Sequence, residues 1–209
     1  MGEPATSTDG RRARRERGRL AVIDAMFELV QEGKVPPPAE AIAQRSGVSV
    51  ASVFRYFDGI ADLQFQTFER FRQRFEPLVH QVIDGSLDER IAALVDARLE
   101  LYERAGMLMM MGRLRALEHA PMVEASARWR ATLADQVRRA FAPESAVLDP
   151  AAANDLLAVI DALTALESWD VMRRTHSRSR AQIARTWCDG IAALVVVAAD
   201  RHGREGAVS

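Results

Sequence analysis

Residues 39–58 read AEAIAQRSGVSVASVFRYFD, and this stretch decides the fold. Ala43 is small enough to let two short helices cross closely. Gly47 lacks a Cβ, so the turn between those helices can adopt a positive φ without strain. Ser49 can cap the second helix with its hydroxyl, and Val53 can pack that helix back against the first. This order of residue sizes predicts a helix-turn-helix with a protruding second helix.

Helical periodicity continues on both sides of this stretch. Upstream, one helix face is predicted from apolar residues at three- and four-residue intervals, namely Leu20, Ile23, Phe27 and Val30. Downstream, helical patterns occupy residues 59–84, 87–104, 107–119, 122–141, 151–174 and 180–201. No stretch alternates convincingly between apolar and polar residues over the length of a strand. The sequence therefore predicts an all-α fold of about nine helices, with an N-terminal three-helix helix-turn-helix domain and a C-terminal helical domain.

The charge of the chain is balanced overall but not locally. Its 209 residues include 28 Lys and Arg against 29 Asp and Glu, a balance that argues against a wholly basic nucleic-acid coat protein. Residues 11–19 read RRARRERGR, with six arginines and one glutamate. We expect this run either to contact DNA phosphates or to be a mobile, solvated arm.

Composition also indicates the compartment. The single cysteine, Cys188, cannot form an internal disulfide, which favours a reducing, cytoplasmic setting. The longest strongly apolar run, residues 191–199, is about half as long as a bilayer span, and no export signal is visible. We therefore expect no membrane partner. Residues 1–10 contain only Met1 as a large apolar side chain, so we expect a disordered leader there.

The stretch IAQRSGVSVASVFRYF followed by DGIADL resembles the DNA-binding domain of TetR-family transcriptional regulators. In that family the pattern is roughly IAxxAGVSxGTLYxHF followed by xxKxxL. Over about residues 15–65, the matching positions include Gly47, Val48, Ser49, Phe57 and Leu63. Pro38 and Ile60 depart from the pattern, because the family frequently has threonine and lysine there. The resemblance implies a DNA-binding domain at residues 11–62 and an effector-binding and dimerisation domain at residues 63–209.

A DNA interface follows from the resemblance. It implies a homodimer whose protruding helices, residues 50–57, enter successive major grooves of a double-stranded DNA operator with two-fold symmetry. Arg55 is suited to a bidentate pair with guanine, with a solvated charge as the alternative. Tyr56 is expected to contact phosphate or to pack in the core, and amides near Gly59 are expected to bind phosphate. The predicted DNA-binding residues are Ser49, Val50, Ala51, Ser52, Phe54, Arg55, Tyr56, Arg15, Arg17 and Arg19.

Effector binding and dimerisation are implied for the later helices. Clustered methionines suit either irregular core packing or a pocket for apolar ligands. The predicted effector-binding residues are Phe71, Phe75, Tyr102, Met107, Met110, Met111, Trp129 and Trp169. The last two helices carry apolar residues on more than one face, so we expect them to pair with a second copy, the alternative being burial within one chain.

Together these features predict a TetR-like repressor that a small, largely apolar effector releases from a palindromic operator. The alternatives are a helical small-molecule-binding protein or an enzyme, either of them without operator binding. The four histidines are far apart, and the chain has no GxSxG motif or glycine-rich phosphate loop. We therefore predict no catalytic activity, no metal site and no cofactor.

Overall fold

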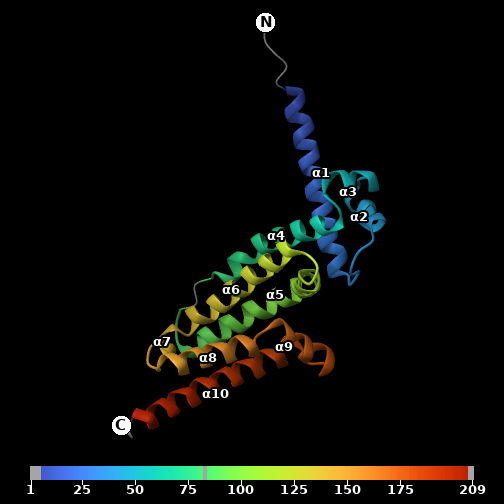
Figure 1. Ribbon diagram of the computed structural model, residues 1–209. Helices are drawn as coiled ribbons and strands as arrows, with labels where there is room; N and C mark the ends of the chain where they lie inside the picture. The colour runs from blue at the N-terminus through green and yellow to red at the C-terminus, as the bar shows by residue number, and fades with distance from the viewer. Residues whose placement is uncertain (1–5, 82–83, 207–209) are drawn as a thin grey trace. The chain divides into compact units, whose positions relative to one another are not determined.

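The computed structural model describes residues 6–81 and 84–206, and every regular element in these residues is a helix (Figure 1). The predicted all-α fold class is therefore confirmed. The elements are α1 (Thr6–Gln31), α2 (Ala39–Ser46), α3 (Val50–Tyr56), α4 (Ile60–Val79), α5 (Leu87–Ala116), α6 (Ala120–Ala140), α7 (Ala142–Ser145), α8 (Pro150–Leu163), α9 (Leu166–Asp170), the π-helical segment η1 (Val171–Thr175) and α10 (Arg180–Gly206).

The chain divides into two compact units. Unit 1 comprises the residues up to Arg74 together with Met107–Ser126, and unit 2 comprises Phe75–Gly106 together with the residues from Ala127 onward. Unit 1 thus contains more residues than the helix-turn-helix alone. The division predicted from the sequence, between residues 62 and 63, separates DNA binding from effector binding and not two compact units, and it stays a prediction.

Unit 1 is built on α1, which packs against both α2 and α3. Val22 and Met26 of α1 are fully buried, as is Ile42 of α2, and Val53 of α3 is nearly so. Burying these side chains together fixes the helix-turn-helix on α1, because each buried aliphatic side chain contributes about 1.5–3 kcal/mol relative to exposure.

Unit 2 packs α8 against α10, with Ile160, Trp187 and Ile191 all fully buried. Arg90 of α5 bonds the carbonyl oxygen of Ala140 and pairs with Glu144 of α7 at 2.6 Å. The guanidinium of Arg90 lowers the pKa of the Glu144 carboxyl below its ordinary value of 4.5. These two contacts of Arg90 connect the start of α5 to the end of α6 and to α7.

Three helix boundaries differ from the sequence prediction. α1 begins at Thr6, so residues 6–10 are helical and do not form a disordered leader, while residues 1–5 lie outside the described residues. α5 is continuous where two helices were expected, and a Cβ at its Gly106 would lie 3.2 Å from the Trp169 ring, so the glycine admits close packing. The segment predicted as one helix at residues 151–174 divides after Thr164, because Ala165 is extended.

α10 contains a long apolar segment. Arg180–Arg201 is long and apolar enough to cross a membrane by length and composition alone, with a mean hydropathy of 1.3. Only 17% of this segment is buried in the structure, but its Ile183, Trp187 and Ile191 side chains are fully buried in unit 2. This one-sided burial is typical of an amphipathic helix that packs one face against its own chain.

Candidate nucleic-acid interface

The turn between α2 and α3 has the geometry that the sequence predicts. Gly47 adopts φ 71°, in the left-handed region, and the Val48 amide donates to the Ala43 carbonyl oxygen at 3.2 Å. The hydroxyl of Ser49 then accepts from the Ser52 amide at 3.2 Å and caps α3. These bonds satisfy polar groups at the two helix ends and so fix the direction of α3.

α3 has one buried face and one exposed face. Val53 and the following Phe57 are 2% and 4% exposed, whereas Phe54 is 54% exposed. The remaining predicted base-contacting residues, Val50, Ala51, Ser52 and Arg55, are exposed or half-buried. A helix that anchors one side in the core and presents the other to solvent can enter a DNA groove.

Arg55 is held in place on the exposed face. Its Nη2 donates to the Ser52 hydroxyl at 2.9 Å, and that hydroxyl lies 3.0 Å from the Ser49 hydroxyl. The guanidinium also lies 5.7 Å from the centre of the Tyr56 ring. These contacts restrict the side chain while leaving it exposed, so less conformational entropy would be lost on pairing with a base.

Tyr56 packs against α1. A Cβ placed at Gly18 would lie only 2.8 Å from the Tyr56 hydroxyl, so the absence of a side chain at Gly18 admits the ring. Tyr56 is nevertheless half-buried and not fully enclosed. Both roles considered from the sequence, packing and phosphate contact, are compatible with this position.

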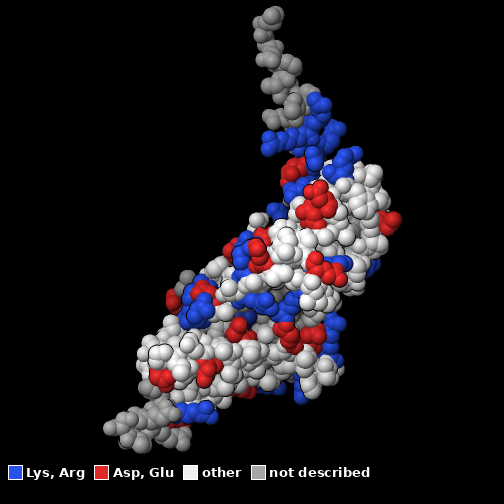
Figure 2. Space-filling view, in the orientation of Figure 1, with Lys and Arg blue, Asp and Glu red and all other residues white. Residues whose placement is uncertain are grey.

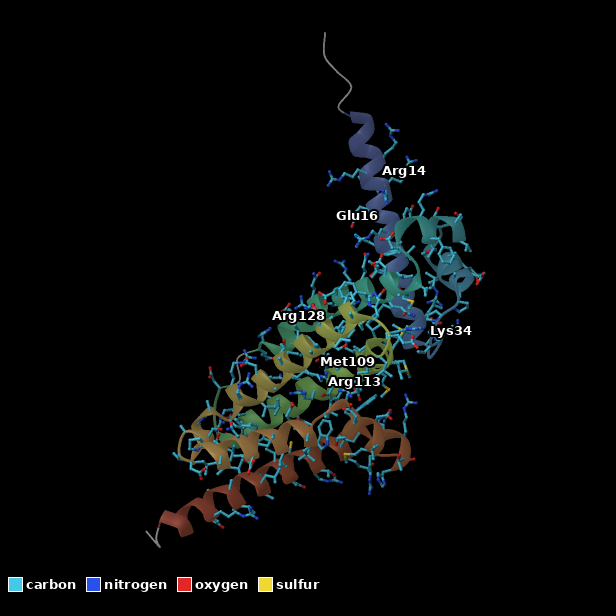
Figure 3. The ribbon with its side chains drawn as sticks, in the orientation of Figure 1. Arg14, Glu16, Lys34, Met109, Arg113 and Arg128 are labelled. Atoms are coloured by element: carbon cyan, nitrogen blue, oxygen red, sulfur yellow. The ribbon has the colours of Figure 1, made fainter. Side chains whose placement is uncertain are left out.

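The arginines of α1 form a basic surface. Lys and Arg side chains gather over the N-terminal part of α1 in Figure 2, and Figure 3 shows Arg14 projecting from the helix. Arg15 and Arg17 are exposed. The run is helical in the structure, so its charges project from the surface of a helix.

Arg19 differs from the other arginines because its guanidinium is already engaged. It pairs with Glu16 at 3.2 Å, bonds the side-chain oxygen of Gln66, and lies 5.8 Å from the centre of the Phe57 ring. A contact between Arg19 and DNA would compete with these interactions. Gln66 was not singled out from the sequence, where nothing distinguishes it from a solvated helix residue.

The start of α4 already holds a carboxylate. Asp62 accepts from the Asp58 amide at 3.0 Å and from the Gln66 side-chain amide at 2.8 Å. A carboxylate is stabilised near a helix N-terminus, and its negative charge opposes a phosphate at the same place. The predicted phosphate contact near Gly59 would therefore have to overcome this repulsion.

The predicted effector residues do not all lie in one unit. Phe71, Met107, Met110 and Met111 belong to unit 1, whereas Phe75, Tyr102, Trp129 and Trp169 belong to unit 2. In unit 1, Phe71 lines a groove between α1 and α4. In unit 2, the Tyr102 and Trp169 ring centres lie 6.1 Å apart.

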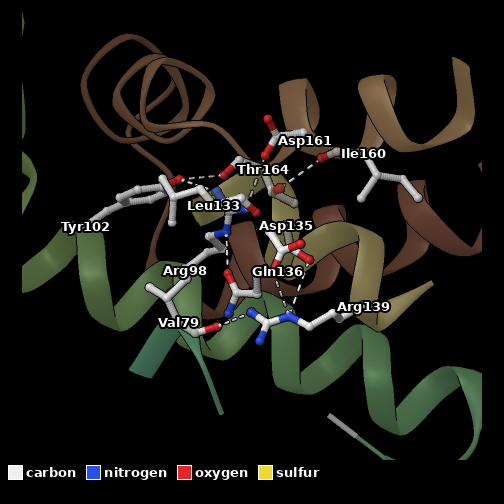
Figure 4. A network of polar contacts seen from close by, with 10 residues as sticks. All are labelled: Val79, Arg98, Tyr102, Leu133, Asp135, Gln136, Arg139, Ile160, Asp161 and Thr164. Atoms are coloured by element: carbon white, nitrogen blue, oxygen red, sulfur yellow. Dashed lines mark hydrogen bonds and ion pairs between the residues drawn. The ribbon is translucent and has the colours of Figure 1, made fainter. Parts of the chain in front are cut away.

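A buried polar network surrounds Tyr102 (Figure 4). Arg98 is only 1% exposed, and it donates to the Tyr102 hydroxyl at 3.1 Å and to Gln136 at 3.0 Å. Its Nη2 also lies 3.1 Å from an Asp161 carboxylate oxygen. The Tyr102 hydroxyl in turn donates to the Thr164 carbonyl oxygen at 2.8 Å. One arginine thus ties together α5, α6 and α8. From the sequence, Arg98 is distinguished only as a charged residue within the apolar pattern of α5.

An exposed apolar surface remains on the last helices. Val159 of α8 is 47% exposed, and Val196 and Val197 of α10 are 57% and 46% exposed. A shallow groove of about 410 Å³ lies between the two helices, lined in part by Leu156, Val159 and Val197. These are the helices that the sequence predicts to pair with a second copy.

Comparison with known proteins identifies the class of fold. No family model and no curated protein sequence matches the chain. Among solved structures, the chain is similar to SCO7518, a transcriptional regulator from Streptomyces coelicolor A3(2), with 23% identity over 86% of this chain and 98% of the other and a TM-score of 0.59. A TetR-family transcriptional regulator from Rhodococcus sp. matches with 15% identity, coverages of 86% and 99%, and a TM-score of 0.62. The multidrug binding protein EbrR, complexed with imidazole, matches with 16% identity, coverages of 84% and 93%, and a TM-score of 0.53.

These matches extend over most of each chain at low sequence identity, so what they establish is the fold. The chain is an all-α helix-turn-helix protein. More particularly, it has the fold of TetR-like transcriptional regulators.

Proposed function

We propose that the chain is a DNA-binding transcriptional regulator of the TetR type. The observation that supports this most directly is α3, which is capped by Ser49, anchored by Val53 and exposed along the face that carries Arg55. The residues proposed to contact DNA from α3 and its cap are Ser49, Val50, Ala51, Ser52, Phe54, Arg55 and Tyr56. Arg55 supplies the bidentate guanine contact, and the exposed methyl groups and aromatic ring supply apolar contacts with thymine.

The arginines of α1 are proposed to supply phosphate contacts and affinity. Arg15 and Arg17 are exposed on the basic surface, whereas Arg19 would first have to leave Glu16 and Gln66. Each phosphate contact releases counterions, so the logarithm of the binding constant falls with the logarithm of salt concentration by about 0.9 per contact. Arg15→Gln and Arg17→Gln should each reduce this slope without changing the preferred sequence.

The proposed assembly is a homodimer through α8 and α10. The exposed valines on these helices provide an apolar surface that a second copy would cover. Two copies of α3 would then read the two halves of a palindromic operator.

The proposed signal is a small, largely apolar effector that weakens operator binding. The predicted residues Phe71, Phe75, Tyr102, Met107, Met110, Met111, Trp129 and Trp169 supply aromatic and thioether surface in the two units. The similar fold of EbrR, solved with imidazole, supports small-molecule binding by this architecture. A coupling of about 1–3 kcal/mol between effector and operator is sufficient for such a response.

The test is selection of bound duplexes from a random DNA pool at fixed salt, using the wild-type protein, Arg55→Ala and Arg130→Ala. Arg130 is an exposed arginine on α6 and controls for loss of one positive charge. The wild type and Arg130→Ala should select the same palindrome, and Arg55→Ala should lose preference at one symmetric pair of positions, at a cost of about 1–3 kcal/mol. Absence of any selected sequence would instead favour a helical small-molecule-binding protein without operator binding.

A further inference from the structure

Unit 1 contains a groove that the proposed DNA interface does not use. It lies between α1 and α4 and has a volume of about 700 Å³. Small-molecule sites commonly have volumes of about 300–1,000 Å³. The groove is therefore large enough for a ligand of several hundred daltons.

The floor of the groove is formed by side chains that are already buried in unit 1. Ile23 of α1 and Phe71 of α4 line it and are 3% and 1% exposed. Thr67 also lines it, but its hydroxyl already donates to the Leu63 carbonyl oxygen at 2.8 Å. The half-buried ring of Phe27 extends this surface toward the rim. Because Ile23 and Phe71 are almost fully covered, the apolar surface that a ligand can reach is mainly the Phe27 ring.

The two sides of the rim carry opposite charges. α1 contributes Asp24 and Glu28, and α4 contributes Arg70 and Arg74. Two of these four groups are already engaged. Glu28 pairs with Arg45 at 3.1 Å, and the Arg74 guanidinium lies 5.6 Å from the centre of the Phe27 ring.

Asp24 and Arg70 are the charges left for a ligand. Both are exposed, and neither has an ion-pair or hydrogen-bonding side-chain partner in the part of the chain that the structure describes. They lie on opposite sides of the same groove and do not pair with each other. A carboxylate attracts an ammonium group, and a guanidinium can bind a carboxylate through two parallel hydrogen bonds.

We propose that this groove binds a dipolar ligand with an apolar body, such as a short apolar peptide. Its ammonium group pairs with Asp24, its carboxylate pairs with Arg70, and its apolar side chains pack on the half-buried Phe27 ring. This site goes beyond the proposed function, because it requires neither operator binding nor a dimer.

The test uses the dipeptide Phe-Leu as the probe and isothermal titration calorimetry of the full chain as the readout. Two analogues remove one charge each: N-acetyl-Phe-Leu has no ammonium group, and Phe-Leu amide has no carboxylate. Phe-Leu should bind, and each analogue should bind about five- to tenfold more weakly, since each loses one partly exposed charge-assisted contact.

Two variants identify the side chains that pair with the charged groups of the probe. Asp24→Asn should weaken Phe-Leu and Phe-Leu amide about five- to tenfold and leave N-acetyl-Phe-Leu unchanged. Arg70→Gln should show the opposite selectivity between the two analogues. Glu40→Gln, which removes an exposed carboxylate on α2, is the matched control and should bind all three probes like the wild type.

The selectivity pattern decides the outcome. No heat of binding with millimolar Phe-Leu, or equal losses for both analogues in both variants, would overturn the proposal. Binding of only N-acetyl-Phe-Leu or only the amide would also overturn it, because the ligand would then be an anion or a cation. The operator selection is run on the same wild-type sample, so failure of one experiment does not imply failure of the other.

Discussion

Gly18 offers a direct test of how α3 is seated on α1. It lies near the middle of a 26-residue helix, where glycine costs about 0.8–1.0 kcal/mol relative to alanine. A Cβ at this position would lie 2.8 Å from the Tyr56 hydroxyl oxygen, 3.0 Å from Cε2 and 3.1 Å from Cζ. Contacts this short require the ring to move, and because the contacting atoms are at the far end of a half-buried side chain, the cost is at the lower end of that of overpacking, about 1 kcal/mol. Gly18→Ala should therefore leave stability nearly unchanged, because this cost offsets the gain in helix propensity.

The same substitution should have the opposite effect when the ring is absent. In a Tyr56→Ala background, Gly18→Ala should stabilise the protein by about 0.8–1.0 kcal/mol, because only helix propensity remains. Urea unfolding of the wild type, both single variants and the double variant gives the coupling free energy, which we expect to be about 1 kcal/mol. An equal stabilisation in both backgrounds would refute the reasoning, because it would show that Tyr56 does not lie on Gly18.

Three further substitutions test other parts of the structure. Ser49→Ala should lower the free energy of unfolding by about 1 kcal/mol in urea titrations by removing the α3 cap, and an unchanged value would argue against the cap. Glu144→Gln should destabilise the protein at pH 7. Pairing with Arg90 lowers the folded-state pKa of Glu144. The difference in unfolding free energy between the wild type and the variant should therefore be full above the ordinary pKa of 4.5 and should shrink as pH falls through the lower folded-state pKa. A difference that does not depend on pH would exclude the ion pair as its source. Val196→Asp should convert a dimer into a single chain by light scattering, and a persistent dimer would place the interface elsewhere.

The helix-turn-helix could be predicted from the sequence because its constraints are local. The positive φ of Gly47 and the Ser49 cap each depend on neighbours within a few residues, and Val53 follows at a fixed spacing on the buried face of the capped helix. Each requirement restricts the residue type at one position. Their order along the chain therefore carries enough information to specify the motif.

The remaining elements depend on contacts that are distant in sequence. Gly106 is compatible with a continuous α5 because Trp169 and Leu166 pack on it. No sequence feature near residue 106 indicates that these two residues are its neighbours. Arg98 is buried where groups from α6 and α8 bond it, and the sequence pattern shows only a charge among apolar residues. The same limit applies to the groove, where Asp24 and Arg70 are ordinary surface charges until α1 and α4 bring them to one rim.

α1 separates the two binding sites proposed for unit 1, which are the groove and the DNA-binding surface of α3. At 3.6 residues per turn, Phe27 lies about 180° around the helix from Gly18, which faces Tyr56. The groove and the surface that contacts α3 are therefore on different faces of α1. A dipeptide in the groove therefore need not displace Tyr56 or cover Arg55. Operator affinity measured with and without saturating Phe-Leu should therefore agree within about twofold. A larger change at constant salt would contradict this separation, because a rigid α1 with ligands on opposite faces provides no differential contact through which one could affect the other.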